Sequence, residues 1–173
     1  MRNEVDMRPL MASFPTGVTV VTTLDGERRP WGMTCTSLCS VALEPPTLLV
    51  CLRLGSPTLA AITTVGSFAV NLLHDSARPA AELFAAPVPD RFERIAWRHD
   101  DGCGGPHLVE AAHTVADCRV SGSSVVGDHA VVLGAVERVT QWPRPRPLLY
   151  GLRRYASWPA AVESEEYYFD FVS

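Results

Sequence analysis

A glycine followed by small polar residues occupies positions 32 to 37, and these residue types suit contact with a planar ligand. Gly32 lets the backbone approach a partner closely. The residues after it offer small side chains, hydroxyl groups and main-chain N–H donors without filling the space beside them: Thr34, Cys35, Thr36 and Ser37. This wall predicts contact with the edge of a ring.

A helix start that suits an anion follows the next apolar segment. Ser56 is a favourable N-cap residue, and Pro57 is a favourable first residue of a helix. Free N–H groups and the positive end of the helix dipole favour a phosphate at this point, and the hydroxyl groups of Ser56 and Thr58 add donors. The alternative interpretation is ordinary helix capping without a ligand.

A histidine follows an aspartate in a tight turn at positions 127 to 129. His129 could donate a hydrogen bond or a proton to a ligand near neutral pH. The alternative is a Gly-Asp turn with no chemical role. Arg91 and Phe92 offer a phosphate clamp and a ring cover, although aromatic residues at helix ends are more often part of the core.

Other reaction chemistries have weak support in this sequence. Cys35 and Cys39 are four residues apart, and His99, Cys103 and His107 follow one another along a loop, but no Cys-x-x-Cys pair is present, so we expect no metal site. The sequence contains no Gly-x-Ser-x-Gly motif of a hydrolase. It also contains no Gly-x-Gly-x-x-Gly motif of a Rossmann domain.

The composition fits one globular domain over residues 1–173. Hydrophobic residues make up 47% and charged residues 20%, and the net charge of −4 disfavours a general affinity for nucleic acid or for an anionic membrane. No uncharged apolar run approaches the ~20 residues that span a bilayer. Five cysteines and a charged N-terminal segment predict reduced thiols and a cytoplasmic protein.

Short strands with a few helices between them dominate the pattern. We expect a short N-terminal helix whose end is formed by residues 7–13, and further helices at 57–65 and 76–86. We also expect one more helical turn at 91–95 and a loop at 99–106. We expect strands at 18–23, from about 30, at 47–54, 67–73, 116–126 and 130–140, and near 148–152. A polar turn is expected at 34–37, and the acidic C-terminal tail is expected to cover a surface. This order favours a closed or partly closed β-barrel over a doubly wound sheet.

The ordered segments FPTGVTVVTT, GMTCTSLCSVALEPPTLLVCL, SPT, FAVNLL, ELFA, RF, GDH and PLLY resemble the short-chain flavin reductases that serve two-component monooxygenases. The resemblance covers roughly residues 7 to 155. It implies a mainly β split β-barrel homodimer that reduces FMN or FAD with NADH or NADPH and supplies reduced flavin to a separate flavin-dependent monooxygenase. It also implies a flavin site and a histidine on the nicotinamide side. The implied flavin-binding residues are Met33, Thr34, Cys35, Thr36, Ser37, Ser40, Arg53, Ser56, Thr58, Phe84, Ala85, Arg91 and Phe92, the nicotinamide-side residue is His129, and Tyr150 and Tyr155 lie nearby.

Three positions depart from the pattern of that family. Thr36 stands where asparagine is frequent and lacks its amide, while Ala42 and Glu44 replace serine and aspartate. Two alternatives within the same fold remain open. One is a flavoprotein that keeps its flavin bound and oxidises another substrate, as pyridoxamine-phosphate-oxidase-like enzymes do, and the other is a flavin-binding electron carrier without turnover. Consumption of NAD(P)H with free flavin in excess distinguishes the three.

Overall fold

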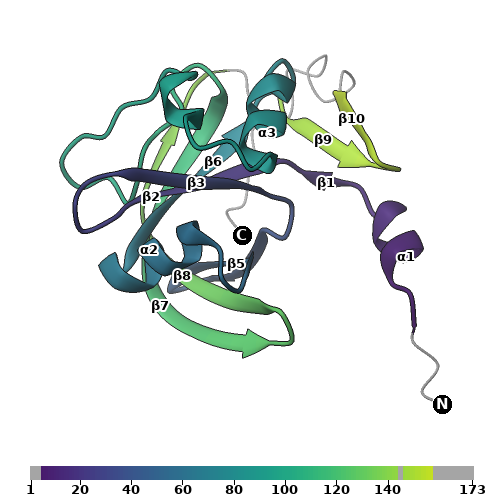
Figure 1. Cartoon of the computed structure of the whole chain (residues 1–173), viewed down its shortest axis with the longest axis horizontal. Coiled ribbons are helices and arrows are strands. Elements are labelled where there is room, and N and C mark those ends of the chain that lie inside the picture. The colour runs from purple at the N-terminus through teal and green to yellow at the C-terminus, as the bar shows by residue number, and fades with distance from the viewer. Residues whose placement is uncertain (1–4, 144–145, 158–173) are drawn as a thin grey trace.

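The computed structural model describes residues 5–143 and 146–157, which form two antiparallel sheets with short helices (Figure 1). The larger sheet has the order β3-β2-β6-β7-β8-β5-β4 and the smaller one the order β1-β9-β10. The strands are β1 (Thr16–Gly17), β2 (Thr19–Leu24), β3 (Pro30–Cys35), β4 (Cys39–Leu43), β5 (Pro46–Arg53), β6 (Ser67–Leu73), β7 (Ala112–Val126), β8 (His129–Gln141), β9 (Leu148–Gly151) and β10 (Arg154–Ser157). The helices are α1 (Arg8–Ala12), α2 (Pro57–Val65), α3 (Arg78–Ala85) and the single 3-10 turn η1 (Arg91–Glu93).

The large sheet curls around one hydrophobic core, which makes it a barrel. Strands from both halves of the sheet direct buried side chains into the same cluster, and α2 adds Ile62 to it. Ser37, just after β3, ties that strand to β5: its Oγ accepts a hydrogen bond from Cys51 N at 2.9 Å and donates one to Cys51 O at 3.1 Å. These bonds bring together two strands that are far apart in the sheet order, as closure of a barrel requires. A mainly β fold was predicted, and it is confirmed.

A second hydrophobic cluster lies beneath α3. Phe84 of that helix packs there with Leu73, Leu108 and Leu148, all almost fully buried. This cluster joins the smaller sheet to the larger one, because Leu148 belongs to β9 and Leu73 to β6. It therefore fixes the position of the segment from α3 to η1, which covers one edge of β3.

Local sequence signals explain the bounds of α2. The Ser56 side chain accepts a hydrogen bond from Leu59 N, Pro57 takes the first helical position, and Gly66 ends the helix with a φ of 76°. Such a left-handed C-cap favours glycine because a β-carbon is strained there. The helix was predicted at these residues, and the strand after it was also predicted with the bounds that β6 has.

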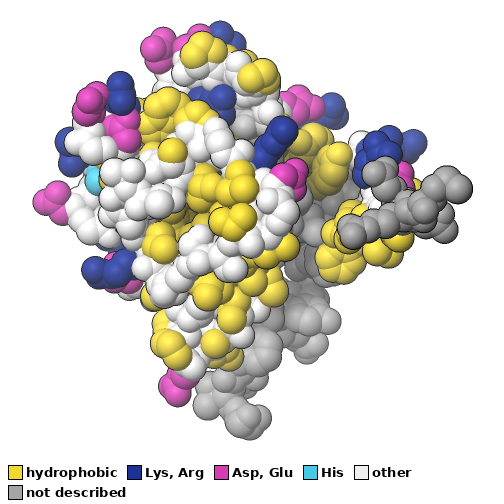
Figure 2. All heavy atoms as spheres, turned by 60° about the horizontal axis from the view of Figure 1, so that its bottom comes forward, with side chains coloured by type: hydrophobic (Ala, Val, Ile, Leu, Met, Phe, Trp, Pro, Cys, Tyr) yellow, Lys and Arg dark blue, Asp and Glu magenta, His cyan; other side chains and the backbone are white. Residues whose placement is uncertain are grey.

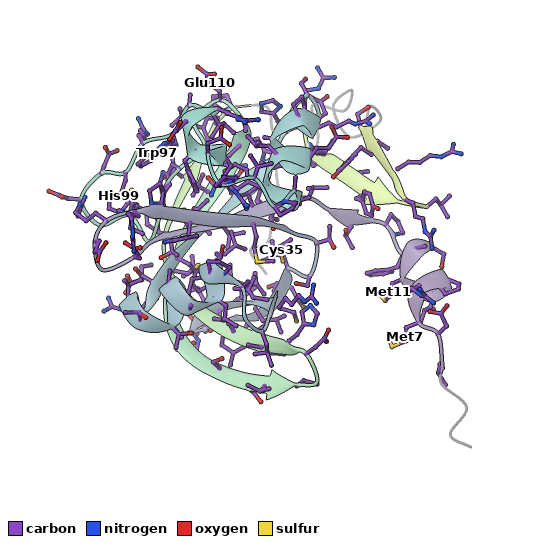
Figure 3. All side chains as sticks on the ribbon, viewed as in Figure 1. Met7, Met11, Cys35, Trp97, His99 and Glu110 are labelled. Atoms are coloured by element: carbon purple, nitrogen blue, oxygen red, sulfur yellow. The ribbon has the colours of Figure 1, made fainter. Side chains whose placement is uncertain are left out.

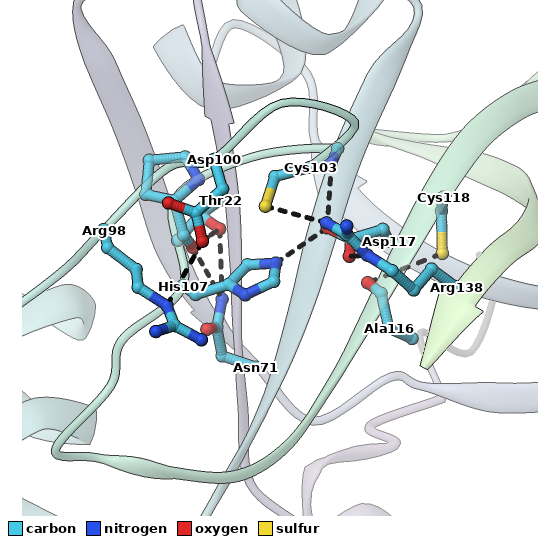
Figure 4. A network of polar contacts seen from close by, with 12 residues as sticks. Thr22, Asn71, Arg98, Asp100, Cys103, His107, Ala116, Asp117, Cys118 and Arg138 are labelled. Carbon is cyan, nitrogen blue, oxygen red and sulfur yellow. Dashed lines mark hydrogen bonds and ion pairs between the residues drawn. The ribbon is translucent and has the colours of Figure 1, made fainter. Parts of the chain in front are cut away.

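The loop between η1 and β7 lies directly on the sheet and is held there by buried polar groups (Figure 4). Asn71 Nδ2 donates to Val20 O at 3.1 Å and to Pro106 O at 3.3 Å, while its Oδ1 accepts from Leu108 N at 2.8 Å. Gly105 is necessary for this contact, since a β-carbon there would collide with the backbone of β2. The predicted loop at 99–106 is confirmed.

Three parts of the secondary structure differ from the prediction. Thr34 and Cys35 belong to β3 and not to a turn, because they pair with Val20 and Thr19 of β2. Residues 39–43 form β4, an edge strand that was not predicted. Strands β1 and β10 were also not predicted, and residues 16–17 were expected to stop a helix. The expected cover formed by the C-terminal tail lies outside the described residues.

Candidate active site

A cleft of about 530 Å³ lies along the edge of β3 that β2 does not cover. It is bounded by the first residues of α2, by the segment from Val88 to Glu93 and by Trp97. Its walls are mostly apolar and aromatic, with a few polar groups at the rim. Its lining residues are Arg29, Pro30, Trp31, Gly32, Pro57, Thr58, Val88, Pro89, Asp90, Arg91, Phe92, Glu93 and Trp97. Concave sites with this lining bind small organic ligands.

The free edge of β3 directs main-chain groups toward this side of the sheet. The Gly32 carbonyl accepts a hydrogen bond from Arg91 Nη1 at 2.8 Å, so the main-chain groups of Gly32 face away from β2. Because alternate residues of a strand face the same side, the main-chain N–H of Thr34 faces this edge too. Gly32 also leaves room for aromatic rings, since a β-carbon there would lie 2.9 Å from Phe84 Cε1.

Arg91 holds the covering segment against β3. Its guanidinium donates to Gly32 O at 2.8 Å and to Ala86 O at 3.0 Å, and its Nε donates to Val88 O at 2.8 Å. Burial lowers the pKa of this side chain, which is half-buried. The structure thus directs Arg91 to main-chain carbonyl groups, and the side chain positions the cleft wall.

Phe84, Phe92 and Trp97 form a series of edge-to-face aromatic contacts along that wall. Phe84 and Phe92 have ring centroids 5.0 Å apart, and Phe92 and Trp97 have centroids 5.8 Å apart. Phe84 is buried, whereas Ala85 beside it is exposed. Such contacts stabilise an aromatic wall beyond the effect of burial alone.

The residues after Gly32 take several different environments. Met33 is half-buried against the main core, and Cys35 is buried in it, where burial raises the pKa of its thiol. The Thr34 hydroxyl donates to Ala81 O at 2.6 Å, which ties β3 to α3. Thr36 is exposed and lines a separate hollow of about 180 Å³, and Ser40 is exposed on β4.

A third group of predicted residues meets where β5 ends beside the β7–β8 turn. Arg53 pairs with His129 across the two strands, and Leu54 N donates to Asp128 O at 2.9 Å. His129 Nδ1 lies 2.8 Å from Asp128 Oδ1, and the imidazole side chain is 45% exposed. The contact with His129 lowers the pKa of Asp128. Both side chains are thus accessible to a ligand arriving from solvent.

The two predicted tyrosines lie on the smaller sheet. Tyr150 of β9 and Tyr155 of β10 pair across the strands, with ring centroids 5.1 Å apart. Arg78 of α3 lies 5.6 Å from the centre of the Tyr155 ring. In Figure 1 these strands and the β7–β8 turn lie at different ends of the molecule.

The structure therefore brings only part of the predicted site together in the cleft. Thr58, Arg91 and Phe92 line it, with Phe84 behind them. Ser56 caps the helix that carries Thr58, and Ala85 ends α3. The other predicted residues lie at or just after the end of β3, on β4, at the β7–β8 turn or on the smaller sheet. Two cleft residues that sequence reasoning did not assign are Trp31 and Trp97. The sequence contains no spacing signal for this pair, because β4, β5, α2, β6 and α3 lie between β3 and Trp97 in the chain.

Cys103, His107 and Asp117 form a cluster on the other side of β2, with one potential ligand atom each within 4.8 Å of the others (Figure 4). Asp117 Oδ1 lies 2.8 Å from His107 Nε2, and Arg138 donates to Asp117 Oδ2 at 2.9 Å and to Cys103 Sγ at 2.8 Å. The guanidinium thus supplies the positive charge within this cluster. We interpret the cluster as a buried ion-pair network that fastens the loop to β7 and β8.

Comparison with known proteins agrees with this geometry. Residues 11–159 match the family model described as "Flavin reductase like domain". A protein of Lentzea aerocolonigenes described as "Flavin reductase (NADPH)" is 54% identical over 88% of this chain and 89% of its own length. A "Flavin reductase (NADH)" of Kitasatospora aureofaciens is 44% identical over 87% of this chain and 79% of its own length.

The fold comparison gives the same result. The NADH:FAD oxidoreductase SgcE6 of Streptomyces globisporus C-1027, solved in complex with NAD and FAD fragments, matches with a TM-score of 0.83 and 32% identity, over 91% of this chain and 93% of that one.

The chain belongs to the flavin reductase family, and it is an oxidoreductase with the split β-barrel fold of that family. The predicted family, the predicted enzyme class and the predicted use of flavin with NAD(P)H are confirmed. No helix among residues 5–143 and 146–157 is long and apolar enough to cross a membrane.

Proposed function

We propose that this protein, acting as one flavin reductase domain over residues 1–173, reduces FMN or FAD with NADH or NADPH and releases the reduced flavin to a separate monooxygenase. The observation that carries the proposal is the cleft along β3, where a free strand edge, a helix start and aromatic walls converge. These features match a ligand that has a ring with hydrogen-bonding edges and a phosphate. The family relationship supplies the reaction class.

The cleft and the strand edge that continues from it fit a flavin in two ways. The flavin ring system accepts hydride at N5, and fixed main-chain donors stabilise the negative charge that develops at its N1 and C2 edge. The Thr34 N–H is such a donor, and it lies on the free edge of β3 just past Gly32, the last residue of that strand that lines the cleft. At the start of α2, Thr58 is buried and lines the cleft, and its main-chain N–H and hydroxyl group provide a site for the phosphate. Pro57 has no N–H, and Leu59 N already donates to Ser56 Oγ.

His129 acts on the nicotinamide side of the site in this proposal. It is exposed beside Asp128, and it is the first residue of β8, directly after the short turn that joins β7 to β8. Hydride transfer itself requires positioning and no acid or base. We therefore assign His129 to orienting the nicotinamide nucleotide or to proton transfer after the hydride step.

A homodimer is part of the proposal, and two apolar surfaces support it. The edge strand β4 leaves Val41 49% and Leu43 81% exposed, and α1 has no buried residue while Leu10 and Phe14 are more than 60% exposed. Figure 2 is turned so that the bottom of Figure 1 comes forward, and it shows hydrophobic side chains spread across the face in view. A second copy of this chain would cover these surfaces and bring its own site residues close.

The same proposal places the enzyme in the cytoplasm. All five cysteines are free thiols, as a reducing compartment favours. Reduced flavin leaves the site as a diffusible product, so the monooxygenase partner needs no second domain in this chain. Neither nucleic acid nor a membrane takes part.

The test is the oxidation of NADH and of NADPH, followed by absorbance, with FMN or FAD in excess. We expect consumption of the nicotinamide nucleotide that depends on added flavin and continues for many turnovers. Background consumption with both flavins would contradict the proposal. Slow bleaching of one bound flavin per chain would favour an electron carrier, and turnover that requires a further organic substrate would favour an oxidase with resident flavin.

A further inference from the structure

A second hollow, of about 180 Å³, lies where β2 begins and where β3 and β6 end. Thr19 of β2 pairs with Cys35 on one side and with Leu72 on the other. Figure 3 labels Cys35, which marks this end of β3. Thr36 and Leu38, just after β3, line the hollow, and it shares no lining residue with the cleft along β3. The hollow is therefore a separate place at which a ligand can bind.

A β-bulge in β7 places a histidine at this hollow. Leu73 of β6 pairs with Ala112 and Leu72 pairs with Thr114, so His113 is an extra residue between two paired positions. Bulges redirect side chains and are frequent next to functional sites. His113 lines the hollow and is half-buried. Among the described residues around the hollow, it is the one with an ionisable side chain.

The other walls of the hollow are mostly aliphatic, and none of the described residues that line it is Lys, Arg, Asp or Glu. Val18, Leu73 and Leu148 form a nearly fully buried part of the wall. A charged ligand would lose its hydration here without an opposite charge, so an uncharged ligand is favoured.

The size of the hollow suits one small ring. An apolar cavity of about 150 Å³ in another protein binds benzene, and this hollow is slightly larger. A single six-membered aromatic ring with a small substituent fits this volume. The three fused rings of a flavin are too large for it.

The state of His113 determines which substituent the hollow favours. Its Nδ1 lies 2.9 Å from Thr114 Oγ1, which leaves Nε2 for a ligand. Burial and the neighbouring His74 lower the pKa of His113 below its ordinary value of 6.5, so the imidazole is neutral near pH 7. Nε2 then donates or accepts a hydrogen bond according to the tautomer, and a hydroxyl group on the ligand matches both cases.

We propose that this hollow, which we name the His113 hollow and define by Thr16, Thr36, Leu38, His113 and Leu148, binds a small uncharged aromatic alcohol, that is, a phenol. The aliphatic side chains cover the ring, and Nε2 of His113 forms a hydrogen bond with the hydroxyl group. The inference goes beyond the proposed function, because the His113 hollow is separate from the cleft proposed for flavin.

The experiment titrates the full-length protein with 4-fluorophenol and with fluorobenzene, followed by fluorine NMR. We expect saturable binding of both probes, with 4-fluorophenol bound about fivefold more tightly, a typical effect of one net hydrogen bond. His113→Leu keeps an apolar wall and loses the hydrogen bond, so it should bind both probes equally. His113→Trp fills the hollow and should bind neither. His99→Leu is the matched control, because His99 lies well away from Cys35 (Figure 3) and should leave both affinities unchanged.

Several results would overturn the proposal. They are an absence of saturable binding, equal affinity of the wild type for the two probes, and a preference for 4-fluorophenol that survives in His113→Leu. Binding that persists in a His113→Trp variant that melts like the wild type would also overturn it. Displacement of 4-fluorophenol by FMN would assign the hollow to the flavin and would overturn a separate site. The comparison of the two probes in the wild type needs no variant, so it remains decisive if His113→Trp does not fold.

Discussion

At the scale of single residues, Ser56 combines two roles that substitutions can separate. Its Oγ caps α2 through Leu59 N, and the family resemblance also implies a place for it near the flavin phosphate. Ser56→Ala loses both roles, so we expect it to lose about 1 kcal/mol of stability and to bind flavin more weakly. Ser56→Asp keeps a good cap and adds a negative charge, so it should keep the stability and bind flavin with about tenfold lower affinity. Thermal unfolding and flavin titration together test the pair.

If Ser56→Asp bound flavin as tightly as the wild type, the phosphate would lie elsewhere. Thr64→Ala is a suitable control, since the Thr64 hydroxyl bonds only to Ala60 O within the exposed part of the same helix.

His129 is expected to affect the other substrate. His129→Ala removes an exposed imidazole and no core contact, so flavin affinity should stay close to that of the wild type. Use of NAD(P)H, measured as kcat/KM at saturating flavin, should fall about tenfold to a hundredfold, the effect of losing one positioning or proton-transferring group. Asp128→Asn keeps the imidazole and should cause a smaller loss. Loss of flavin binding in a correctly folded His129→Ala variant would show that this residue lies on the flavin side.

At the scale of elements, the buried network around Asp117 determines how the loop between η1 and β7 responds to acid. Burial alone would raise the pKa of Asp117, but hydrogen bonds from His107, Gly104 N and Arg138 outweigh it and hold the pKa below its ordinary value of 3.8. The ionised carboxylate therefore adds stability above pH 3.8, and this contribution disappears as the pH falls through the lowered pKa.

We expect Asp117→Asn to lower the free energy of unfolding by about 2 kcal/mol at neutral pH, which is typical of hydrogen bonds to a charged group. Below pH 3.8, the free energy of unfolding of this variant should fall less steeply with pH than that of the wild type. Urea unfolding at several pH values measures both effects. Asp100→Asn in the same loop is the control, because Asp100 is 65% exposed. An acid response of Asp117→Asn identical to that of the wild type would assign the pH dependence to other carboxylates.

Elements were predictable from the sequence where local signals mark their ends. Ser56, Pro57 and Gly66 define α2, and Gly127, with a φ of 60°, marks the β7–β8 turn. Strand β1 consists of two residues and exists only because Thr16 and Gly17 pair with β9, which is distant in the sequence. No local pattern predicts such a strand. The edge strand β4 was missed because its small residues continue the composition of the segment before it.

In the candidate site, too, features with local sequence signals were predictable, and features that depend on distant contacts were not. Thr58, Arg91 and Phe92 were predictable as cleft residues from helix signals and from family resemblance. That the guanidinium of Arg91 bonds to carbonyl groups, and that the Ser37 hydroxyl closes the barrel on Cys51, depends on contacts between distant segments. These bonds follow from the three-dimensional packing, and residue types alone do not predict them.

At the scale of the whole molecule, the candidate site residues lie in separate parts of a single copy of the chain. His129 lies at the β7–β8 turn, and Tyr150 and Tyr155 lie on the smaller sheet (Figure 1). The apolar surfaces of β4 and α1 are exposed in a single copy, and a helix of five residues is unstable without a partner surface. The proposed homodimer would account for both observations, because a second copy would bury these surfaces and complete each site.

Leu43→Glu tests this arrangement, because it places a charge on the most exposed apolar residue of β4. Burying an unpaired carboxylate in an interface is costly, so we expect the variant to sediment as a monomer and to lose most of its affinity for flavin. Val139→Glu is the matched control: Val139 is 59% exposed near the end of β8 away from the turn, and a charge there should leave a dimer intact. A wild-type chain that sediments as a stable monomer and still binds flavin would contradict the arrangement, since every site would then be complete within one copy.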